Sequence, residues 1–236
     1  MSREAIILAG GFGTRLQAVV SDVPKPMAPV AGRPFLSYLL ETLYRFKYDH
    51  VVLSVGYKSQ VIKDYFGPAY KSIQLSYCVE RDALGTGGGI RLASDYMDSD
   101  SFLILNGDTY FDLDLHAFES FHASGKFDLS VALRSVNDAG RYGSVQVDGD
   151  RIIGFAEKSG NVQSGLINGG VYQAHKDLIM TIPEGIKCSF ETEILQREYR
   201  TKRFGGWVQE GYFIDIGIPE DYERANVEFG ELFGRR

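Results

Sequence analysis

A glycine-rich segment near the amino terminus could bind phosphate. Residues 8–16 read LAGGFGTRL, so three glycines and a threonine directly follow a short apolar run. Glycine lets the backbone pass close to a ligand, and successive amide groups that face one concavity attract phosphate oxygens. No Gly-Lys-Ser/Thr follows, and Leu16 stands where a dinucleotide fingerprint needs Gly or Ala, so neither of those two phosphate loops is present. For the glycines alone, a tight turn without a ligand is the alternative.

Two cations follow in the same connection. Arg15 belongs to the glycine segment, and Lys25 lies between Pro24 and Pro26. The two proline rings restrict the backbone on both sides of Lys25 and oppose a continuous helix, so we expect this lysine to be held in place. An isolated Pro-Lys-Pro would more often be a surface turn. Together with Arg15, Lys25 gives a pair of fixed cations, which suits a triphosphate.

Two aspartates follow apolar residues at distant points of the chain. Asp108 comes shortly after the apolar run at residues 102–105, and Asp215 follows Phe213-Ile214. Two carboxylates suit Mg²⁺, which prefers hard oxygen ligands, retains waters and shares phosphate oxygens. One aspartate from each half of the chain could hold one such ion. A helix cap or a closed turn is the alternative for either residue alone.

The expected secondary structure brings the first of these segments to one edge of a sheet. β-prone runs alternate with helix-like segments, which predicts an α/β fold with a mainly parallel sheet flanked by helices. In such sheets ligands bind beyond the carboxyl ends of the strands. The expected strands are 5–9, 51–55, 73–79 and 102–105, and the expected helices lie near 36–43, 59–66 and 90–97.

The pattern changes after residue 127. Strand-like runs follow one another there, and Asp148-Gly149-Asp150 is typical of a hairpin turn, so we expect an antiparallel or mixed section. Pro219 stands at the favoured first position of a closing helix. The runs are strands at 129–133, 144–147, 152–155 and 171–172 and a helix near 190–199.

Length and composition limit the class of protein. A chain of 236 residues suits one domain over residues 1–236. A net charge of −6 argues against nucleic-acid binding. The amino-terminal apolar run is too short for a membrane span and lacks a signal-peptide layout, so we expect a cytoplasmic protein that binds no membrane. Zinc or disulfide spacing is absent from the cysteines and histidines, which are Cys78, Cys188, His50, His116, His122 and His175.

The glycine segment followed by Pro-Lys-Pro resembles the opening motif of the sugar-phosphate nucleotidyltransferases, also called nucleotide-sugar pyrophosphorylases. The resemblance covers nearly the whole chain. It implies the family's single-domain, Rossmann-like (GT-A-like) fold with a mixed sheet, and transfer of a nucleotidyl group from a nucleoside triphosphate to a sugar 1-phosphate with release of pyrophosphate. The later motifs, in order, are LGTGG at 84–88, NGDTY at 106–110, Glu157-Lys158, NGGVY at 168–172 and FIDIGIPEDY at 213–222.

The resemblance also implies roles for individual residues. Arg15 and Lys25 would act in catalysis together with Asp108 and Asp215, which would hold Mg²⁺. The nucleobase would lie against Gly85 and Thr86, although a plain loop before a helix is the alternative there. The implied nucleotide-binding residues are Leu8, Ala9, Gly10, Gly11, Gly13, Thr14, Glu80, Gly85, Thr86, Asn106 and Gly107.

A second group of residues is implied to hold the sugar phosphate. Lys158 would bind the phosphate and Glu157 the sugar hydroxyls, whereas a solvated surface pair is the alternative from the residues alone. Ser159 stands where many family members have proline, which implies a less rigid loop. The full implied set is Gly143, Glu157, Lys158, Asn168 and Gly170.

Within the family, the segment SDVPKPMAPVAGRPFLSYLLE and the length are most similar to guanylyltransferases that act on D-glycero-α-D-manno-heptose 1-phosphate. That similarity implies GTP as the nucleotide, GDP-heptose as the product and a role in surface polysaccharide synthesis. No hexapeptide repeat follows residue 220, so we expect no carboxy-terminal β-helix domain.

Other assignments stay open. Guanylyltransferases acting on mannose 1-phosphate, and glucose-type uridylyl- or thymidylyltransferases, differ at the base and the sugar by a few hydrogen bonds. Asp112-Leu113-Asp114 resembles the metal-binding motif of glycosyltransferases. A non-catalytic nucleotide-sugar sensor is a further alternative, and the family resemblance is compatible with a homo-oligomer.

Overall fold

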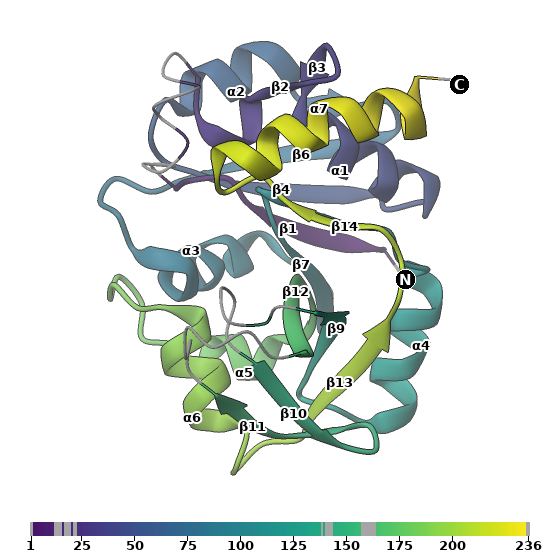
Figure 1. The fold of residues 1–236 in the computed structure, drawn as a ribbon. Coiled ribbons are helices and arrows are strands. Elements are labelled where there is room, and N and C mark those ends of the chain that lie inside the picture. The colour runs from purple at the N-terminus through teal and green to yellow at the C-terminus, as the bar shows by residue number, and fades with distance from the viewer. Residues whose placement is uncertain are drawn as a thin grey trace.

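The computed structural model describes residues 2–11, 16, 20, 23–137, 139, 144–156 and 164–234. Their central feature is a ten-stranded mixed sheet that carries helices on both faces (Figure 1). The strand order is β10 (Ser144–Asp148), β11 (Arg151–Ala156), β13 (Phe204–Gln209), β9 (Leu129–Val136), β12 (Gly165–His175), β7 (Ser101–Asn106), β1 (Glu4–Leu8), β4 (His50–Val55), β6 (Ile73–Val79) and β5 (Ala69–Tyr70).

The amino-terminal half supplies the parallel part of the sheet. Strands β7, β1, β4 and β6 are parallel neighbours, and the chain passes between them through helices. This confirms the α/β arrangement predicted from the alternation of strands and helices. The connecting helices are α1 (Phe35–Arg45), α2 (Ser59–Phe66) and α3 (Gly85–Ala93).

The carboxy-terminal half is mixed, as the clustered strand pattern predicted. β12 pairs antiparallel with both β7 and β9, whereas β13 pairs parallel with β9. The predicted hairpin joins β10 to β11, and Gly149 at its tip has a φ of 54°, which favours glycine. Helices α4 (Leu115–Gly125) and α5 (Lys176–Met180) lie before β9 and after β12.

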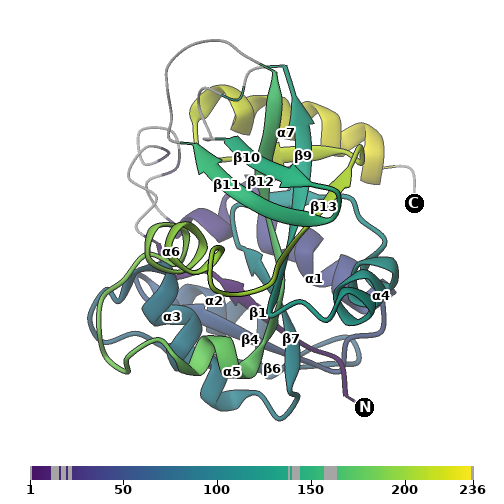
Figure 2. The same cartoon turned by 90° about the horizontal axis from the view of Figure 1, so that it is seen from below.

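Two apolar clusters cover the two faces of the sheet. In β1, Ala5 and Ile7 belong to one cluster and Ile6 to the other, because successive side chains of a strand point to opposite faces. All three are fully buried, which explains the uninterrupted apolar run. Figure 2 shows α3, α5 and α6 (Gln196–Glu198) on one side of the sheet and α1 and α4 on the other.

A separate two-stranded sheet joins distant parts of the chain. β8 (Thr109–Phe111) pairs antiparallel with β14 (Phe213–Asp215), and Asp215 lies opposite Thr109. The backbone N–H of Ile216 donates to the carbonyl of Asp108 at 2.9 Å. This pairing was not predicted, and it places Asp215 next to Asp108 before the chain enters α7 (Pro219–Phe233).

Several boundaries differ from the prediction. Helix α3 begins at Gly85 rather than near Ile90, because tertiary contacts support a glycine-rich turn that has little helix propensity of its own. The helix expected at 190–199 is a π-helical segment, η3 (Phe190–Leu195), followed by α6. The remaining short elements are η1 (Lys25–Met27), β2 (Pro29–Val30), β3 (Arg33–Pro34) and η2 (Ser94–Tyr96).

The described part of the chain contains no helix with both the length and the apolar content needed to cross a membrane.

Candidate active site

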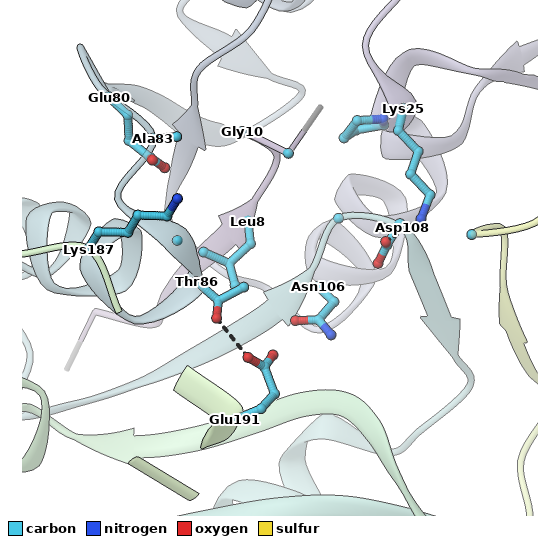
Figure 3. A pocket seen from close by; sticks show the side chains of 15 residues that line it. Leu8, Gly10, Lys25, Glu80, Ala83, Thr86, Asn106, Asp108, Lys187 and Glu191 are labelled. Carbon is cyan, nitrogen blue, oxygen red and sulfur yellow. Dashed lines mark hydrogen bonds and ion pairs between the residues drawn. The ribbon is translucent and has the colours of Figure 1, made fainter. Parts of the chain in front are cut away.

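A cavity of about 470 Å³ lies at the carboxyl ends of the parallel strands β1, β6 and β7 (Figure 3). This is the edge at which the predicted sheet would bind a ligand. The predicted residues that line it are Leu8, Gly10, Gly11, Lys25, Glu80, Gly85, Thr86, Asn106, Gly107 and Asp108. The lining also includes residues that were not predicted, namely Pro26, Ala83, Lys187, Glu191 and Gly217.

The first glycine-rich segment leaves β1 at this edge. Ala9 is buried, and its N–H donates to the carbonyl of Ser54 at 2.7 Å, which fixes the start of the segment against β4. A Cβ added at Gly11 would meet nothing within 4 Å, so the space beside Gly11 is open. The predicted residues Gly13, Thr14 and Arg15 lie outside the described residues.

Lys25 and the two aspartates meet at one end of the cavity. The Lys25 Nζ lies 2.5 Å from Asp108 Oδ2 and 3.9 Å from Asp215 Oδ1. The Lys25 side chain is only 10% exposed, whereas those of Asp108 and Asp215 are 34% and 28% exposed. Lys25 begins the short 3₁₀ helix η1, which ends at Met27, so the chain forms no continuous helix there, as the flanking prolines predicted.

The two carboxylates are held by separate interactions. Thr109 Oγ1 donates to Asp108 Oδ1 at 3.2 Å, and the Gly217 N–H donates to Asp215 Oδ1 at 2.7 Å. A Cβ at Gly217 would lie 2.8 Å from that oxygen and 3.1 Å from Lys25 Nζ. Gly217 is therefore needed for the close approach of the lysine to Asp215.

This donor set fits a hard divalent cation. Asp108 and Asp215 supply carboxylate oxygens on both sides of one positive charge, which here is the Lys25 ammonium. Within the residues that the structure describes, no group of three or more His, Cys, Asp or Glu could hold a metal. An ion bound by these two aspartates would need water or phosphate for its remaining ligands, which is the coordination that Mg²⁺ favours.

The second glycine-rich segment forms the start of α3 and is covered by the chain at residues 186–190. The Cys188 N–H donates to the carbonyl of Leu84 at 2.9 Å, and the Gly87 N–H donates to the carbonyl of Cys188 at 3.0 Å. Gly85 has a φ of 71°, and a Cβ there would lie 2.5 Å from the Cys188 oxygen. The glycines therefore allow two backbone segments to touch.

Thr86 completes this contact from inside the cavity. Its Oγ1 donates to Glu191 Oε2 at 2.7 Å and accepts from the Phe190 N–H at 2.8 Å. Figure 3 shows the Thr86 hydroxyl and the Glu191 carboxylate facing each other in the wall of the cavity. Burial raises the pKa of the neighbouring Cys188 thiol, which favours its neutral form.

Glu80 stands where β6 ends. Its Oε1 accepts from Ser54 Oγ at 3.1 Å, and its Oε2 accepts from the Leu84 N–H at 3.0 Å. Each carboxylate oxygen thus has one hydrogen bond from the protein and retains capacity to accept another. A Cβ at Gly10 would lie 3.0 Å from Glu80 Oε1, so Glu80 also borders the first glycine-rich segment.

The predicted sugar-phosphate residues are only partly described. Gly143, Glu157 and Lys158 lie outside the described residues. Asn168 and Gly170 are on β12, where the Gly170 N–H donates to Asn168 Oδ1 at 2.9 Å. They do not line the cavity.

A hydrogen-bonded group nevertheless connects β12 to the cavity. Asn168 Nδ2 donates to the Tyr172 hydroxyl at 2.8 Å, and a Cβ at Gly170 would meet Asn106 Nδ2 at 2.9 Å. Burial, and then the charge of Glu191, raise the pKa of the Tyr172 hydroxyl far above its ordinary value, so Tyr172 stays protonated. Asn106 Oδ1 is buried and has no hydrogen-bond partner among the described residues, although Asn106 lines the cavity.

The alternative metal motif at residues 112–114 has another explanation. Asp114 caps α4, because its Oδ1 accepts from the N–H groups of His116 and Ala117 at 3.0 Å each. Neither Asp112 nor Asp114 lines the cavity. The geometry therefore gives no support to a glycosyltransferase metal site there.

Sequence patterns gave no signal for two residues of the cavity wall. Lys187 and Glu191 lie far from the glycine motifs in the chain, Lys187 just before the helix expected near 190–199 and Glu191 inside it. Their place in the cavity depends on the contact between residues 186–190 and α3. Glu191, in the Ser-Phe-Glu sequence at 189–191, belongs to no motif whose spacing would have predicted a place in the site.

Known proteins resemble this chain over nearly its full length. The family model described as nucleotidyl transferase matches residues 4–231. D-glycero-alpha-D-manno-heptose 1-phosphate guanylyltransferase of Aneurinibacillus thermoaerophilus is 45% identical over 225 residues, which cover 95% of this chain and 97% of that protein. Mannose-1-phosphate guanylyltransferase of Mycobacterium tuberculosis is 35% identical over 95% of this chain and 64% of its own.

Solved structures give the same picture. The crystal structure of HddC from Yersinia pseudotuberculosis complexed with GMP-PN has a TM-score of 0.84 and 38% identity, and the match covers 96% of this chain and 99% of that chain. A UDP-glucose pyrophosphorylase from Acinetobacter baumannii reaches a TM-score of 0.86 at 18% identity over 99% of this chain and 95% of its own. At that identity the likeness supports the fold alone.

Proposed function

The chain belongs to the nucleotidyl transferase family, and we propose that it condenses GTP with D-glycero-α-D-manno-heptose 1-phosphate to give GDP-heptose and pyrophosphate. The observation that carries the proposal is the convergence of Lys25, Asp108 and Asp215 at one end of a cavity lined by both glycine-rich segments. That end offers positive charge and metal-binding oxygens to phosphates. The other end is lined by Glu80, Gly85 and Thr86, beside which the base would lie.

The nucleotide would lie along the cavity. Its phosphates would follow the open space at Gly11 toward Lys25, and Gly13, Thr14 and Arg15 would complete their binding. Its base would lie near Glu80, Gly85 and Thr86. Leu8, Ala9, Asn106 and Gly107 would border the ribose and the phosphates, because they stand at the ends of β1 and β7.

The reaction needs no general base from the protein. A phosphate oxygen of the sugar 1-phosphate is already ionised near neutral pH, since the second pKa of a phosphate monoester is about 6. It would attack the α-phosphorus in line while the bond to the β-phosphate breaks and pyrophosphate leaves. Lys25 and Arg15 would bind oxygens of the departing pyrophosphate, and catalysis would rest on positioning and charge neutralisation.

Asp108 and Asp215 would hold Mg²⁺. The ion, when bound, would offset charge on the α-phosphate. The Lys25 ammonium lies within ion-pair distance of both carboxylates and balances part of their charge. When the nucleotide and Mg²⁺ bind, the Lys25 ammonium would leave Asp108 and bind the phosphates of the nucleotide.

The sugar phosphate would bind between the cavity and β12. Lys158 would bind its phosphate and Glu157 its hydroxyls, with Gly143, Asn168 and Gly170 completing the site. The hydrogen bond between Asn168 and Tyr172 and the close contact of Gly170 with Asn106 support this side for the second substrate.

A pyrophosphate-release assay tests the proposal. Four nucleoside triphosphates are each combined with the 1-phosphates of heptose, mannose and glucose, with Mg²⁺ and without it. We expect the fastest release from GTP with heptose 1-phosphate, and only in the presence of Mg²⁺. A faster reaction with mannose 1-phosphate would show that mannose 1-phosphate, and not heptose 1-phosphate, is the preferred sugar substrate.

The same assay separates the other candidate functions. Sugar transfer from finished GDP-heptose without pyrophosphate release would favour a glycosyltransferase. Tight binding of GDP-heptose with no release from any pair would identify a non-catalytic sensor. Either outcome would overturn the proposed reaction.

The cellular setting is part of the proposal. A single catalytic domain over residues 1–236 would work in the cytoplasm, where GTP is available, and GDP-heptose would supply surface polysaccharide synthesis. The enzyme would bind neither nucleic acid nor membrane, in keeping with its net charge of −6. Self-association, which the family resemblance allows, is measurable by sedimentation.

A further inference from the structure

Lys187 places a second positive charge in the cavity wall, far from the phosphate end. Figure 3 shows its side chain pointing toward Glu80 and Ala83, whereas Lys25 and Asp108 lie on the opposite side of the cavity. Within the described residues, no hydrogen bond or ion pair engages the Lys187 ammonium. If Lys25 binds the phosphates, Lys187 is positioned for the other end of the nucleotide.

The backbone at Lys187 is held on both sides. Cys188 forms hydrogen bonds with Leu84 and Gly87, and a Cβ at Gly88 would lie 2.7 Å from the carbonyl oxygen of Ile186. Residues 186 and 188 are therefore packed against the start of α3. The exposed side chain of Lys187 lies between these two fixed neighbours and lines the cavity.

Lys187 and Glu80 together form a donor and an acceptor on one wall. Each Glu80 oxygen accepts one hydrogen bond from the protein and can accept another from a ligand. Guanine presents two neighbouring donors, N1–H and the N2 amino group, beside the acceptor O6. Adenine and cytosine present an amino donor where guanine has O6, and a lysine ammonium cannot accept a hydrogen bond from it.

We infer that Lys187 is a specificity-determining residue that donates a hydrogen bond to O6 of guanine while Glu80 accepts from N1–H and the N2 amino group. This inference rests on the proposed function for the placement of the base at the Glu80 end of the cavity. The contact of residues 186–190 with α3 would therefore place Lys187, which is far along the chain from both glycine-rich segments, beside the base. Lys187 thereby favours GTP over ATP and CTP.

Nucleotide analogues test the two contacts separately. 6-Thio-GTP replaces O6 by sulfur, a weak acceptor, and ITP lacks the N2 amino group. Binding of GTP, 6-thio-GTP, ITP and ATP is measured by calorimetry for the wild type and for Lys187→Met, Lys187→Arg and the control Lys202→Met. Lys202 does not line the cavity. Binding without sugar phosphate isolates the base contact from turnover.

We expect Lys187→Met to weaken GTP binding about tenfold, the equivalent of one good hydrogen bond to a charged group. The wild type should bind 6-thio-GTP about tenfold more weakly than GTP, and Lys187→Met should abolish that preference. The ITP penalty should stay unchanged in this variant, because it reports on Glu80. Lys187→Arg should keep most of the preference for GTP, and Lys202→Met should match the wild type.

The outcomes separate this inference from the proposed function. An unchanged 6-thio-GTP penalty in Lys187→Met, or a lost ITP penalty, overturns the inference even if the enzyme turns over GTP. A Lys187-dependent preference for GTP in a protein that releases no pyrophosphate overturns the proposed function and retains the inference. Failure of the wild type to bind GTP overturns both.

Discussion

Gly11 in the first glycine-rich segment of the cavity and the glycines at the start of α3 in the second use the absence of a side chain in opposite ways. A Cβ at Gly11 would meet nothing within 4 Å. A Cβ at Gly85 would lie 2.5 Å from the carbonyl oxygen of Cys188, and one at Gly87 would lie 2.5 Å from the Cys188 sulfur. Gly11 borders open space, whereas the chain itself fills the space beside Gly85 and Gly87.

The difference shows that a glycine-rich segment can have either of two physical reasons. Gly11 leaves room for a ligand, whereas Gly85, Gly87 and Gly88 leave room for the chain at residues 186–190. A substitution at Gly11 should therefore affect nucleotide binding, and a substitution at Gly85 or Gly87 should affect folding. The following variants test that distinction.

Gly85→Ala should have the largest effect, on stability. Its backbone has a φ of 71°, which costs an alanine about 1–2 kcal/mol, and the Cβ would overlap a backbone oxygen. Since overpacking adds about 1–3 kcal/mol, we expect the free energy of unfolding in urea to fall by roughly 2–5 kcal/mol. Gly149→Ala is the matched control, because Gly149 has a φ of 54° and open space around it. Equal losses in the two variants would show that crowding by Cys188 is unimportant.

Lys25→Ala should have its main effect on turnover. Loss of one fixed cation facing the phosphates should lower kcat by about 10²–10³-fold, by analogy with the removal of one charge-stabilising donor. The measurement is steady-state pyrophosphate release, with Lys202→Ala as the control for removal of a lysine outside the cavity. Wild-type turnover in Lys25→Ala would refute the catalytic role of Lys25. It would also remove the cation that is proposed to bind the phosphates beside Gly11.

Thr86→Val should weaken the contact between the second segment and residues 186–190. The variant loses the hydroxyl that joins Glu191 Oε2 to the Phe190 N–H. An unpaired buried group costs about 1–3 kcal/mol, so urea denaturation should report a loss in that range. Thr86→Ser keeps the hydroxyl and should unfold close to the wild type. A stable Thr86→Val protein would mean that backbone contacts alone hold the two segments together.

Gly11→Ala should have the smallest effect on folding. Its Cβ would enter open space, so the free energy of unfolding should stay within about 0.5 kcal/mol of the wild type. The added methyl group should raise the KM for GTP severalfold if the phosphates pass beside Gly11. A destabilised Gly11→Ala variant with an unchanged KM would reverse the comparison between the two segments.

The amino-acid sequence by itself determined the local features of the site. The apolar run at residues 5–9 predicted the strand β1, and the proline rings around Lys25 predicted a fixed cation. The helix expected near residues 36–43 is α1, in which Leu36, Leu39, Leu40 and Leu43 are buried. These features depend on side-chain burial and backbone restriction within a few residues, which a sequence displays directly.

Only the tertiary structure decided which distant residues meet. Asp215 reaches Asp108 through the pairing of β14 with β8, and Lys187 reaches the cavity through the contact of residues 186–190 with the glycines of α3. Both contacts depend on backbone hydrogen bonds, and every residue of a strand offers nearly the same backbone donor and acceptor. The choice of partner therefore follows from the packing of the whole sheet and its helices, which no local pattern contains.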